Sequence, residues 1–224
     1  MADTRPLCIS RRSLLATGVA AGLAALPLSL LPAAAWAAHG PVVTILGDSI
    51  TAGYGLPQAA SLPIQLQAAL EKLGVPCLVR GAGVSGDTTA NGAGRMDFSI
   101  RPDTKVVVVE LGGNDILQGV DPKVTRANLD HILTRLKERH MNVVLCGMRA
   151  PREIGAGYAR DFDAIYPELA RQHDVTLYPD LLAGVGRDPA LHQPDAIHPN
   201  AKGVLIIAAR LAPVVAKELS LAAA

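Results

Sequence analysis

The sequence is poor in the features on which several classes of protein depend. Aromatic residues make up only 3% of its 224 residues, and its formal net charge is +1. A nucleic-acid-binding surface needs a clustered excess of lysine and arginine, so the near-neutral charge argues against that class. No pair of histidines or cysteines has the spacing of metal ligands. With few aromatic rings, the core must be built from aliphatic side chains, as in buried parallel strands covered by helices.

The first 37 residues differ in character from the rest. Arginines precede an apolar, nearly uncharged run, which ends at the small residues of an A-x-A cleavage site. The arginines are Arg5, Arg11 and Arg12, the run spans 13–31, and the small residues are Ala35 and Ala37. This pattern predicts an export signal peptide over residues 1–37. The paired arginines directly before the run favour twin-arginine export over ordinary secretion or a retained membrane anchor.

The remaining residues, 38–224, are expected to form one domain. Short apolar runs alternate there with segments of helical periodicity, which predicts a parallel sheet between two helical layers. The expected strands cover 42–46, 76–80, 105–111, 142–148 and 175–179, and the expected helices 61–74, 122–139, 158–172 and 201–219. Ligands of such sheets bind beyond the carboxyl ends of the strands, so the chemistry is expected in the loops there.

Ser49 lies in the first of these loops, in "ILGDSITAGYG" (45–55). No serine in the chain has the two flanking glycines of the G-x-S-x-G elbow that α/β-hydrolases use. A serine hydroxyl is a poor nucleophile unless a neighbouring base takes its proton. The question is therefore whether the other loops supply a base and an oxyanion site.

"DAIHPN" (195–200) offers the base. Asp195 stands three residues before His198, Pro199 restrains the chain after it, and Asn200 can cap the following helix. A carboxylate at that spacing can bond the imidazole Nδ1 and leave Nε2 facing a substrate. The alternative is a turn-forming aspartate beside a helix-entry histidine.

Donors for a developing oxyanion come from three loops. Ser49 and Gly86 can supply backbone N–H groups, and Asn114 in "GGND" can supply a side-chain amide. Taken singly, "GGND" also suits a strand-ending turn, and "SGDTT" suits a helix N-cap at Asp87 or Thr88. Their joint presence on successive carboxyl-end loops favours a catalytic site.

With these blocks the chain resembles the GDSL-type, or SGNH, hydrolases, and especially the small exported bacterial thioesterase, lysophospholipase and arylesterase subfamily. The matching blocks are "GDSIT", "GVSGDTT", "GGND" and "DAIHPN", where "GDSIT" departs from the commoner GDSLS. The resemblance implies a three-layer α/β/α fold, flavodoxin-like, with a five-stranded parallel sheet in the order 2-1-3-4-5.

The resemblance also implies a function, the hydrolysis of carboxylic esters through an acyl-enzyme on Ser49. His198 is then the base, Asp195 its partner, and Ser49, Gly86 and Asn114 form the oxyanion hole. Short-chain and aryl esters are the expected substrates, with acyl thioesters and lysophospholipids as further candidates. A carbohydrate acetylesterase on the same fold is the alternative enzyme. A secreted lipid- or carbohydrate-binding module is the non-enzyme alternative, and it is disfavoured because no catalytic position is missing.

The same resemblance places an acyl groove at Ile116, Leu117, Ile154 and Tyr158, although some of these side chains could simply cover the core. Asp48 and Asp115 are expected to brace the loops, not to act as acids. The expected partner is a small-molecule ester or thioester, with no nucleic acid, no cofactor, no metal and no stable membrane insertion after removal of the leader. We expect an exported monomer, periplasmic or secreted.

Two further features test this interpretation. "GAGVSG" (81–86) has the form G-x-G-x-x-G but follows the second expected strand, so it is not expected to bind a dinucleotide. Of the three cysteines, Cys8 belongs to the leader, while Cys77 and Cys146 fall on strands that the expected order separates. Because a disulfide needs Cα atoms within ~7 Å, we predict two free, buried thiols.

Overall fold

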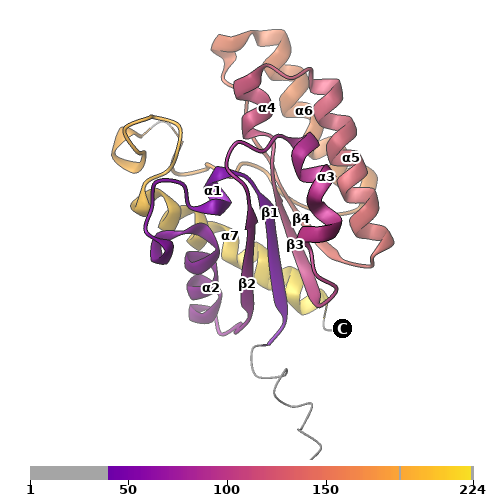
Figure 1. Cartoon of the computed structure of the whole chain (residues 1–224), viewed down its shortest axis with the longest axis vertical. Coiled ribbons are helices and arrows are strands. Elements are labelled where there is room, and N and C mark those ends of the chain that lie inside the picture. Colours follow the sequence, from indigo (N-terminus) through magenta and orange to yellow (C-terminus); the bar gives the residue numbers. More distant parts are fainter. Residues whose placement is uncertain (1–39, 187, 223–224) are drawn as a thin grey trace, which may run out of the picture. The chain divides into compact units, whose positions relative to one another are not determined.

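The computed structural model describes residues 40–186 and 188–222. The predicted leader, residues 1–37, lies outside the described residues, and its role in export stays a prediction. Within the described part of the chain, no helix combines the length and the apolar character needed to cross a membrane. The described residues form one sheet with helices on both of its faces (Figure 1).

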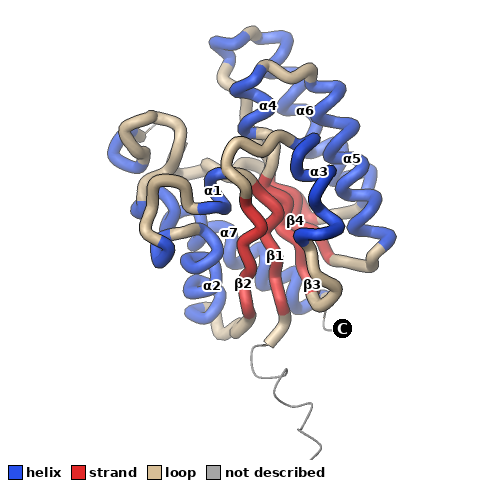
Figure 2. Tube along the Cα trace, in the orientation of Figure 1, coloured by secondary structure: helices blue, strands red, loops and turns tan. Residues whose placement is uncertain are grey.

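The sheet has five parallel strands in the order β2-β1-β3-β4-β5, which confirms the prediction (Figure 2). The strands are β1 (Val42–Gly47), β2 (Leu78–Gly83), β3 (Thr104–Glu110), β4 (Asn142–Cys146) and β5 (Thr176–Tyr178). All six residues of β1 are buried, as are four of the five in β4. Burial on both faces explains why these strands appear in the sequence as unbroken aliphatic runs.

Two helical layers cover the sheet (Figure 1). One consists of α2 (Leu62–Lys72) and α7 (Ala201–Leu221), and the other of α3 (Thr89–Ser99), α5 (Pro122–Glu138) and α6 (Ala156–His173). Short helices complete the carboxyl-end loops: α1 (Ser49–Ala52), α4 (Gly113–Gln118) and the 3₁₀ turns η2 (Gln58–Ala60), η3 (Arg152–Ile154) and η4 (Pro189–Leu191). The three-layer α/β/α architecture is therefore confirmed.

The expected helix starts agree with the structure where a cap was identifiable. The Asp121 side chain accepts the N–H of Lys123 at 2.9 Å, and Pro122 is the first residue of α5. Asn200 caps α7 by accepting the N–H of Lys202 at 3.0 Å. These bonds satisfy amide groups that have no acceptor within the helix.

The second strand was placed too early in the sequence. It was expected over 76–80, whereas β2 runs from Leu78 to Gly83 and so includes the first two glycines of "GAGVSG". A Cβ on Gly81 would lie 2.7 Å from the Pro63 Cγ, and one on Gly83 would collide with the backbone of α1. The glycines therefore allow α1 and α2 to pack closely on β2, and do not form a dinucleotide loop.

Helix α3 was not predicted, because its sequence contains Gly92 and Gly94 and has little apolar periodicity. It begins with a capping box between Thr88 and Asn91, so the N-cap alternative for Thr88 is correct. A Cβ on Gly92 would meet the side chain of Leu111, so tertiary packing against the end of β3 makes glycine necessary here.

Cys77 and Cys146 are free and buried, as predicted. Two strands, β1 and β3, separate β4 from β2, the strand that Cys77 precedes. Cys8 lies outside the described residues.

Candidate active site

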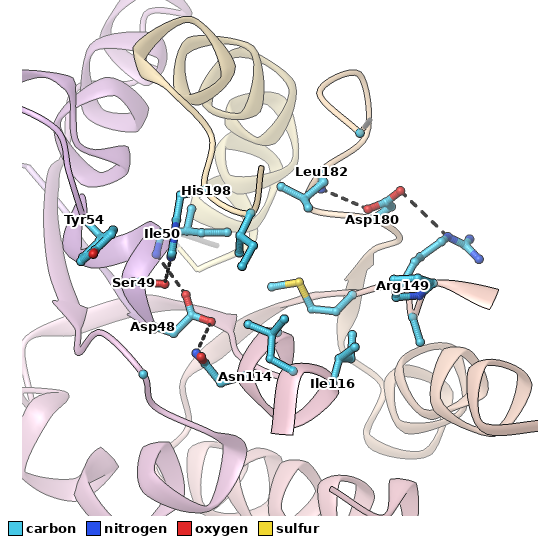
Figure 3. Close-up of a pocket in the computed structure, with 18 of the residues that line it drawn as sticks. Asp48, Ser49, Ile50, Tyr54, Asn114, Ile116, Arg149, Asp180, Leu182 and His198 are labelled. Carbon is cyan, nitrogen blue, oxygen red and sulfur yellow. Dashed lines mark hydrogen bonds and ion pairs between the residues drawn. The ribbon is translucent and has the colours of Figure 1, made fainter. Parts of the chain in front are cut away.

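The loops at the carboxyl ends of the strands meet around Ser49 (Figure 3). Asp48 and Ser49 follow β1, Gly86 follows β2, and Asn114 follows β3. His198 comes from the long segment between β5 and α7. All five residues line one cavity, which lies at the edge of the sheet where the parallel topology predicts ligand binding.

Ser49 is the first residue of α1, a single helical turn. Asp48 caps this turn, because its Oδ1 accepts the N–H of Ile50 at 3.0 Å. Gly53 ends the turn in a left-handed conformation with φ +74°, and a Cβ there would lie 2.8 Å from the Cβ of Ser61. The turn is thus held at both ends, and Ser49, although only 8% exposed, lines the cavity.

Ser49, His198 and Asp195 form a continuous hydrogen-bonded line. The Ser49 Oγ lies 2.8 Å from the His198 Nε2, and the His198 Nδ1 lies 2.7 Å from the Asp195 Oδ2. With Nδ1 protonated and donating to the carboxylate, Nε2 accepts from the hydroxyl and can take its proton. The structure therefore brings together the three residues that the sequence placed 149 and 3 positions apart.

The Asp195 carboxylate also shapes the turn that carries His198. Its Oδ1 accepts the backbone N–H groups of Ile197 at 2.9 Å and His198 at 3.0 Å. Ala196, inside this turn, has φ +59°. The backbone N–H of His198, its imidazole and the N–H of Ile197 lower the pKa of Asp195 to about 2. The carboxylate is consequently ionised at neutral pH and can stabilise an imidazolium ion.

Gln193 joins the serine turn to the histidine loop. Its Nε2 donates to the carbonyl oxygens of Tyr54 at 2.8 Å and Pro199 at 3.1 Å, and its backbone N–H donates to the His198 carbonyl at 2.8 Å. The Tyr54 ring lies against the imidazole, with a centroid distance of 4.7 Å. Gly55 is required beside Gln193, because φ is +70° there and a Cβ would overlap the Gln193 side-chain oxygen.

The three predicted oxyanion donors line the same cavity as the Ser49 hydroxyl. The backbone amides of Ser49 and Gly86 donate to no other group in the part of the chain that is described. Gly86 has φ +88°, a conformation that favours glycine. The Asn114 Nδ2 donates to the Asp87 carbonyl at 3.0 Å and to the Asp48 Oδ2 at 3.2 Å.

A pair of buried carboxyl groups, Asp48 and Glu110, supports the serine turn. Asp48 is 3% exposed and Glu110 is fully buried at the end of β3. The Glu110 Oε2 accepts from the Thr51 hydroxyl at 2.6 Å and from the Asp48 N–H at 3.3 Å. Burial raises the pKa of Glu110 well above its usual value, and the charge of Asp48 raises it further. Burial also raises the pKa of Asp48.

We expect Glu110→Gln to reduce the loss of folding stability that occurs as the pH rises above the ordinary pKa of a glutamate. Because its pKa is raised by folding, Glu110 contributes stability that is complete below its ordinary pKa and is lost as the pH rises through the folded pKa. Glutamine keeps an oxygen for Thr51 and Asp48 but does not titrate. Urea titrations across this pH range give the free energy of unfolding at each pH. The slope of that free energy against pH is compared between the variant and the unmodified protein.

The matched control is Glu138→Gln, on the exposed end of α5, which should leave the slope near that of the unmodified protein. Asp48 still titrates in the Glu110→Gln protein, so the slope should become smaller and not vanish. An unchanged slope in a folded Glu110→Gln protein contradicts the raised pKa of Glu110.

Asp115, the other acid near the site, braces the loops as expected. It is fully buried and lines no part of the cavity. Its Oδ2 accepts the N–H of Thr89 at 2.8 Å, and its Oδ1 accepts the hydroxyls of Thr89 at 2.5 Å and Thr125 at 2.9 Å. The carboxylate therefore ties α4 to the starts of α3 and α5.

The cavity beside Ser49 has a volume of about 830 Å³. The walls near Ser49 and His198 are largely apolar. The apolar side chains are Ile50, Ile116, Leu117, Met148, Ala150, Pro151, Leu182 and Ile197. Arg149 and Asp180 lie at the end of the cavity away from Ser49 (Figure 3). Within the described residues no cluster of His, Cys, Asp or Glu could hold a metal ion.

Two of the four predicted groove residues, Ile116 and Leu117, line this cavity, and the other two do not. Ile154 lies in η3 with 48% of its surface exposed. The Tyr158 hydroxyl donates to the Val120 carbonyl at 2.9 Å, and its ring stacks on that of Phe162. The first turn of α6 directs the Tyr158 ring against α4 and the core.

The comparisons with known proteins agree with this geometry. Residues 45–205 match the GDSL-like Lipase/Acylhydrolase family. The chain belongs to that family. An arylesterase of Vibrio mimicus is 37% identical over 176 residues, which cover 78% of this chain and 88% of the relative. Thioesterase 1/protease 1/lysophospholipase L1 of Escherichia coli K12 is 38% identical over 165 residues, 73% of this chain and 78% of the relative.

Among solved structures, the SGNH-hydrolase family esterase AlinE4 is similar to this acylhydrolase with a TM-score of 0.68 and 44% sequence identity. The match covers 80% of this chain and 96% of AlinE4. The predicted family and fold are thus confirmed, and the chain is an ester hydrolase. The non-catalytic binding module is not supported.

Sequence reasoning missed several residues around the site of this acylhydrolase. Gln193 and Glu110 act through contacts with segments far away in the chain, so no local pattern marks them. Met148 and Arg149, which follow β4 and line the cavity, were not among the four groove residues named from the sequence. Leu182 and Ile197 carried no signal, because their loop has neither helical nor strand periodicity.

Proposed function

We propose that this acylhydrolase cleaves carboxylic esters by acyl transfer to Ser49 and then to water. The observation that carries the proposal is the line from the Ser49 Oγ through the His198 imidazole to Asp195, with distances of 2.8 and 2.7 Å. Ser49 and His198 line an apolar cavity that is large enough for an acyl or aryl group.

In the first step the Ser49 Oγ attacks the ester carbonyl while the His198 Nε2 takes its proton. Asp195 stabilises the imidazolium ion, and the tetrahedral oxyanion accepts hydrogen bonds from the amides of Ser49 and Gly86. The Asn114 N–H that bonds Asp48 at 3.2 Å turns to the oxyanion, since this is the longer of its two bonds. The carbon–oxygen bond to the leaving alcohol then breaks, and His198 protonates that alcohol.

In the second step a water molecule attacks the acyl-enzyme. His198 takes a proton from the water, a second tetrahedral intermediate forms in the same oxyanion site, and the bond between the acyl carbon and Oγ breaks. The proton on His198 returns to the Ser49 oxygen, and the carboxylic acid leaves. The enzyme is restored without a cofactor.

The cavity favours short-chain and aryl esters as substrates. Ile116, Leu117, Met148 and Leu182 give it apolar walls, which suit an acyl or aryl group better than a sugar. Acyl thioesters and lysophospholipids are further candidates, in keeping with the names of the relatives. A carbohydrate acetylesterase on this fold remains the alternative enzyme.

A serine-directed phosphonate tests the nucleophile, and a substrate panel tests the preference. We expect covalent labelling of the peptide that contains Ser49, with loss of ester hydrolysis in proportion to labelling. Across p-nitrophenyl esters, phenyl acetate, acyl-CoA thioesters and acetylated xylose, kcat/KM should be at least about tenfold higher for aryl esters than for the sugar. Labelling at another residue contradicts the assignment of Ser49, and a reversed preference supports the acetylesterase.

A further inference from the structure

The oxyanion site takes its donors from three separate loops. Ser49 follows β1, Gly86 follows β2 and Asn114 follows β3, so the parallel strands fix only the points at which these loops begin. An oxyanion hole accelerates the reaction when its donors are held in place before the charge develops. Some further interaction must therefore hold the loops against one another.

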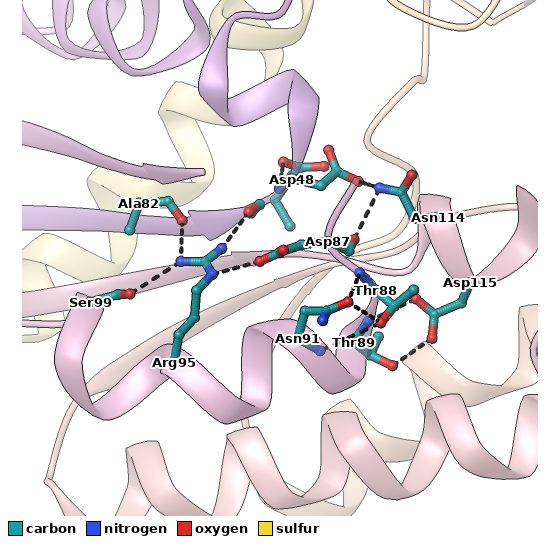
Figure 4. Close-up of polar contacts among 12 residues, drawn as sticks. Asp48, Ala82, Asp87, Thr88, Thr89, Asn91, Arg95, Ser99, Asn114 and Asp115 are labelled. Atoms are coloured by element: carbon teal, nitrogen blue, oxygen red, sulfur yellow. Dashed lines mark hydrogen bonds and ion pairs between the residues drawn. The ribbon is translucent and has the colours of Figure 1, made fainter. Parts of the chain in front are cut away.

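Arg95 of α3 makes that connection (Figure 4). Its Nη2 donates to the Gly47 carbonyl at 2.8 Å, and its Nη1 donates to the Ala82 carbonyl at 2.9 Å. Its Nε bonds the Asp87 Oδ2 at 2.6 Å, and Nη1 also reaches the Ser99 hydroxyl at 3.2 Å. One guanidinium group thus binds the end of β1, the end of β2 and the residue after Gly86.

The contacts of Arg95 continue to the third loop through Asp87. The carboxylate of Asp87 bonds the guanidinium, and its backbone carbonyl accepts from the Asn114 Nδ2 at 3.0 Å. The side chains of Arg95 and Asp87 are only 21% and 11% exposed, so solvent weakens their ion pair little. The position of the Asn114 amide consequently depends on a residue that does not line the cavity.

We propose that Arg95 is a positioning residue for the oxyanion hole, which rests on the proposed function of Ser49, Gly86 and Asn114. Its planar guanidinium meets two backbone carbonyls and a carboxylate at once, an arrangement that a lysine ammonium cannot reproduce. Arg95 touches neither the substrate cavity nor the line from Ser49 to Asp195. Its loss should lower kcat and leave KM nearly unchanged, because the transition state depends on the hole more than the bound ester does.

A double-mutant cycle between Arg95 and Asn114 tests this proposal. We expect Arg95→Met to lower kcat for p-nitrophenyl butyrate about 10- to 100-fold, and Asn114→Ala about 100- to 1,000-fold, with KM changing less than about threefold. If Arg95 acts through the hole, part of its effect passes through the Asn114 amide, so Arg95→Met should lower kcat by a smaller factor in the Asn114→Ala background than in the unmodified enzyme. A role in folding alone would instead give losses that multiply.

Arg80→Met is the matched control. Arg80 makes a bidentate ion pair with Asp103, at 2.5 and 2.7 Å, and does not line the cavity. Its kcat should stay within about twofold of the unmodified enzyme. Circular dichroism and thermal unfolding verify that each variant is folded.

Arg95→Lys covers the case in which Arg95→Met does not fold. It keeps the positive charge but not the planar fork, and we expect a kcat about 3- to 30-fold below that of the unmodified enzyme. The proposal is overturned if either folded Arg95 variant has full activity, or if the two losses multiply in the cycle. In both cases a reduced kcat of Asn114→Ala still supports the oxyanion hole. Unmodified kcat in Asn114→Ala identifies a failure of the proposed oxyanion hole itself, and the role of Arg95 falls with it.

Discussion

Ser49→Ala is expected to lower kcat/KM for p-nitrophenyl esters roughly 10⁵- to 10⁶-fold. Alanine removes the oxygen to which the acyl group is transferred, while His198 and Asp195 remain in place. The oxyanion donors and the apolar cavity are unchanged, so a small rate above that of water should persist. Initial rates over a range of ester concentrations, with enzyme purified free of the unmodified protein, measure the loss.

Ser220→Ala is the control for this experiment, because Ser220 lies near the exposed end of α7 and its hydroxyl donates to the Lys217 carbonyl at 2.7 Å. It should keep the kcat/KM of the unmodified enzyme. Turnover by Ser49→Ala at the unmodified rate on every ester tested would show that another group is the nucleophile.

Asp195→Asn is expected to lower kcat roughly 10³- to 10⁴-fold at neutral pH. In the unmodified enzyme the pKa of Asp195 is about 2, so the carboxylate is charged throughout the range in which the enzyme would be assayed. An asparagine amide has no charge to stabilise the imidazolium ion. Its NH₂ group can also face the His198 Nδ1, which moves the ring proton to Nε2 and removes the base. Values of kcat and KM from about pH 6 to about pH 9 measure the loss.

The matched control is Asp188→Asn. Asp188 lies in the same segment between β5 and α7 and, like Asp195, accepts a backbone N–H two residues ahead, that of Ala190 at 2.9 Å. Its carboxylate does not contact the His198 imidazole, so kcat should stay within about threefold. If Asp195→Asn remains within about tenfold of the unmodified enzyme, the carboxylate is not the partner of the catalytic base.

The site is supported by buried and half-buried polar groups that lie outside the proposed reaction. Glu110 holds the serine turn, Asp115 holds the starts of α3 and α5, and Arg95 spans the ends of β1 and β2. Each of these groups is hydrogen-bonded to segments from other parts of the chain. Such contacts restrict the motion of the loops and hold Ser49, Gly86 and Asn114 in position.

Most of the fold could be predicted from local patterns. The aliphatic runs of β1, β3 and β4 and the capped starts of α5 and α7 each carry a clear signal, because burial on both faces or a cap needs particular residue types. Helix α3 could not be predicted in this way. Its glycines weaken the helix locally, and it is stable because it packs against α5 and β1 and is capped by Thr88.

The candidate site was predictable where its chemistry needs particular residues at a short spacing. Asp195 and His198 stand three positions apart, and Ser49 directly follows a strand, so both could be identified as candidates. The groove could be predicted only in part, since Tyr158 points to the core and Leu182 and Ile197 enter from a loop without periodicity. The direction in which a loop side chain points depends on the elements packed around it.

By itself the sequence determined the alternation of strands and helices apart from α3, the two free thiols and the residue types that ester hydrolysis needs. These follow from burial, capping and the chemistry of each side chain, which act over a few residues. Only the tertiary structure decided that Ser49 and His198 meet at 2.8 Å, which side chains line the cavity, and that Arg95 joins three loops. Such contacts depend on how distant segments pack together, and that packing leaves no local pattern in the chain.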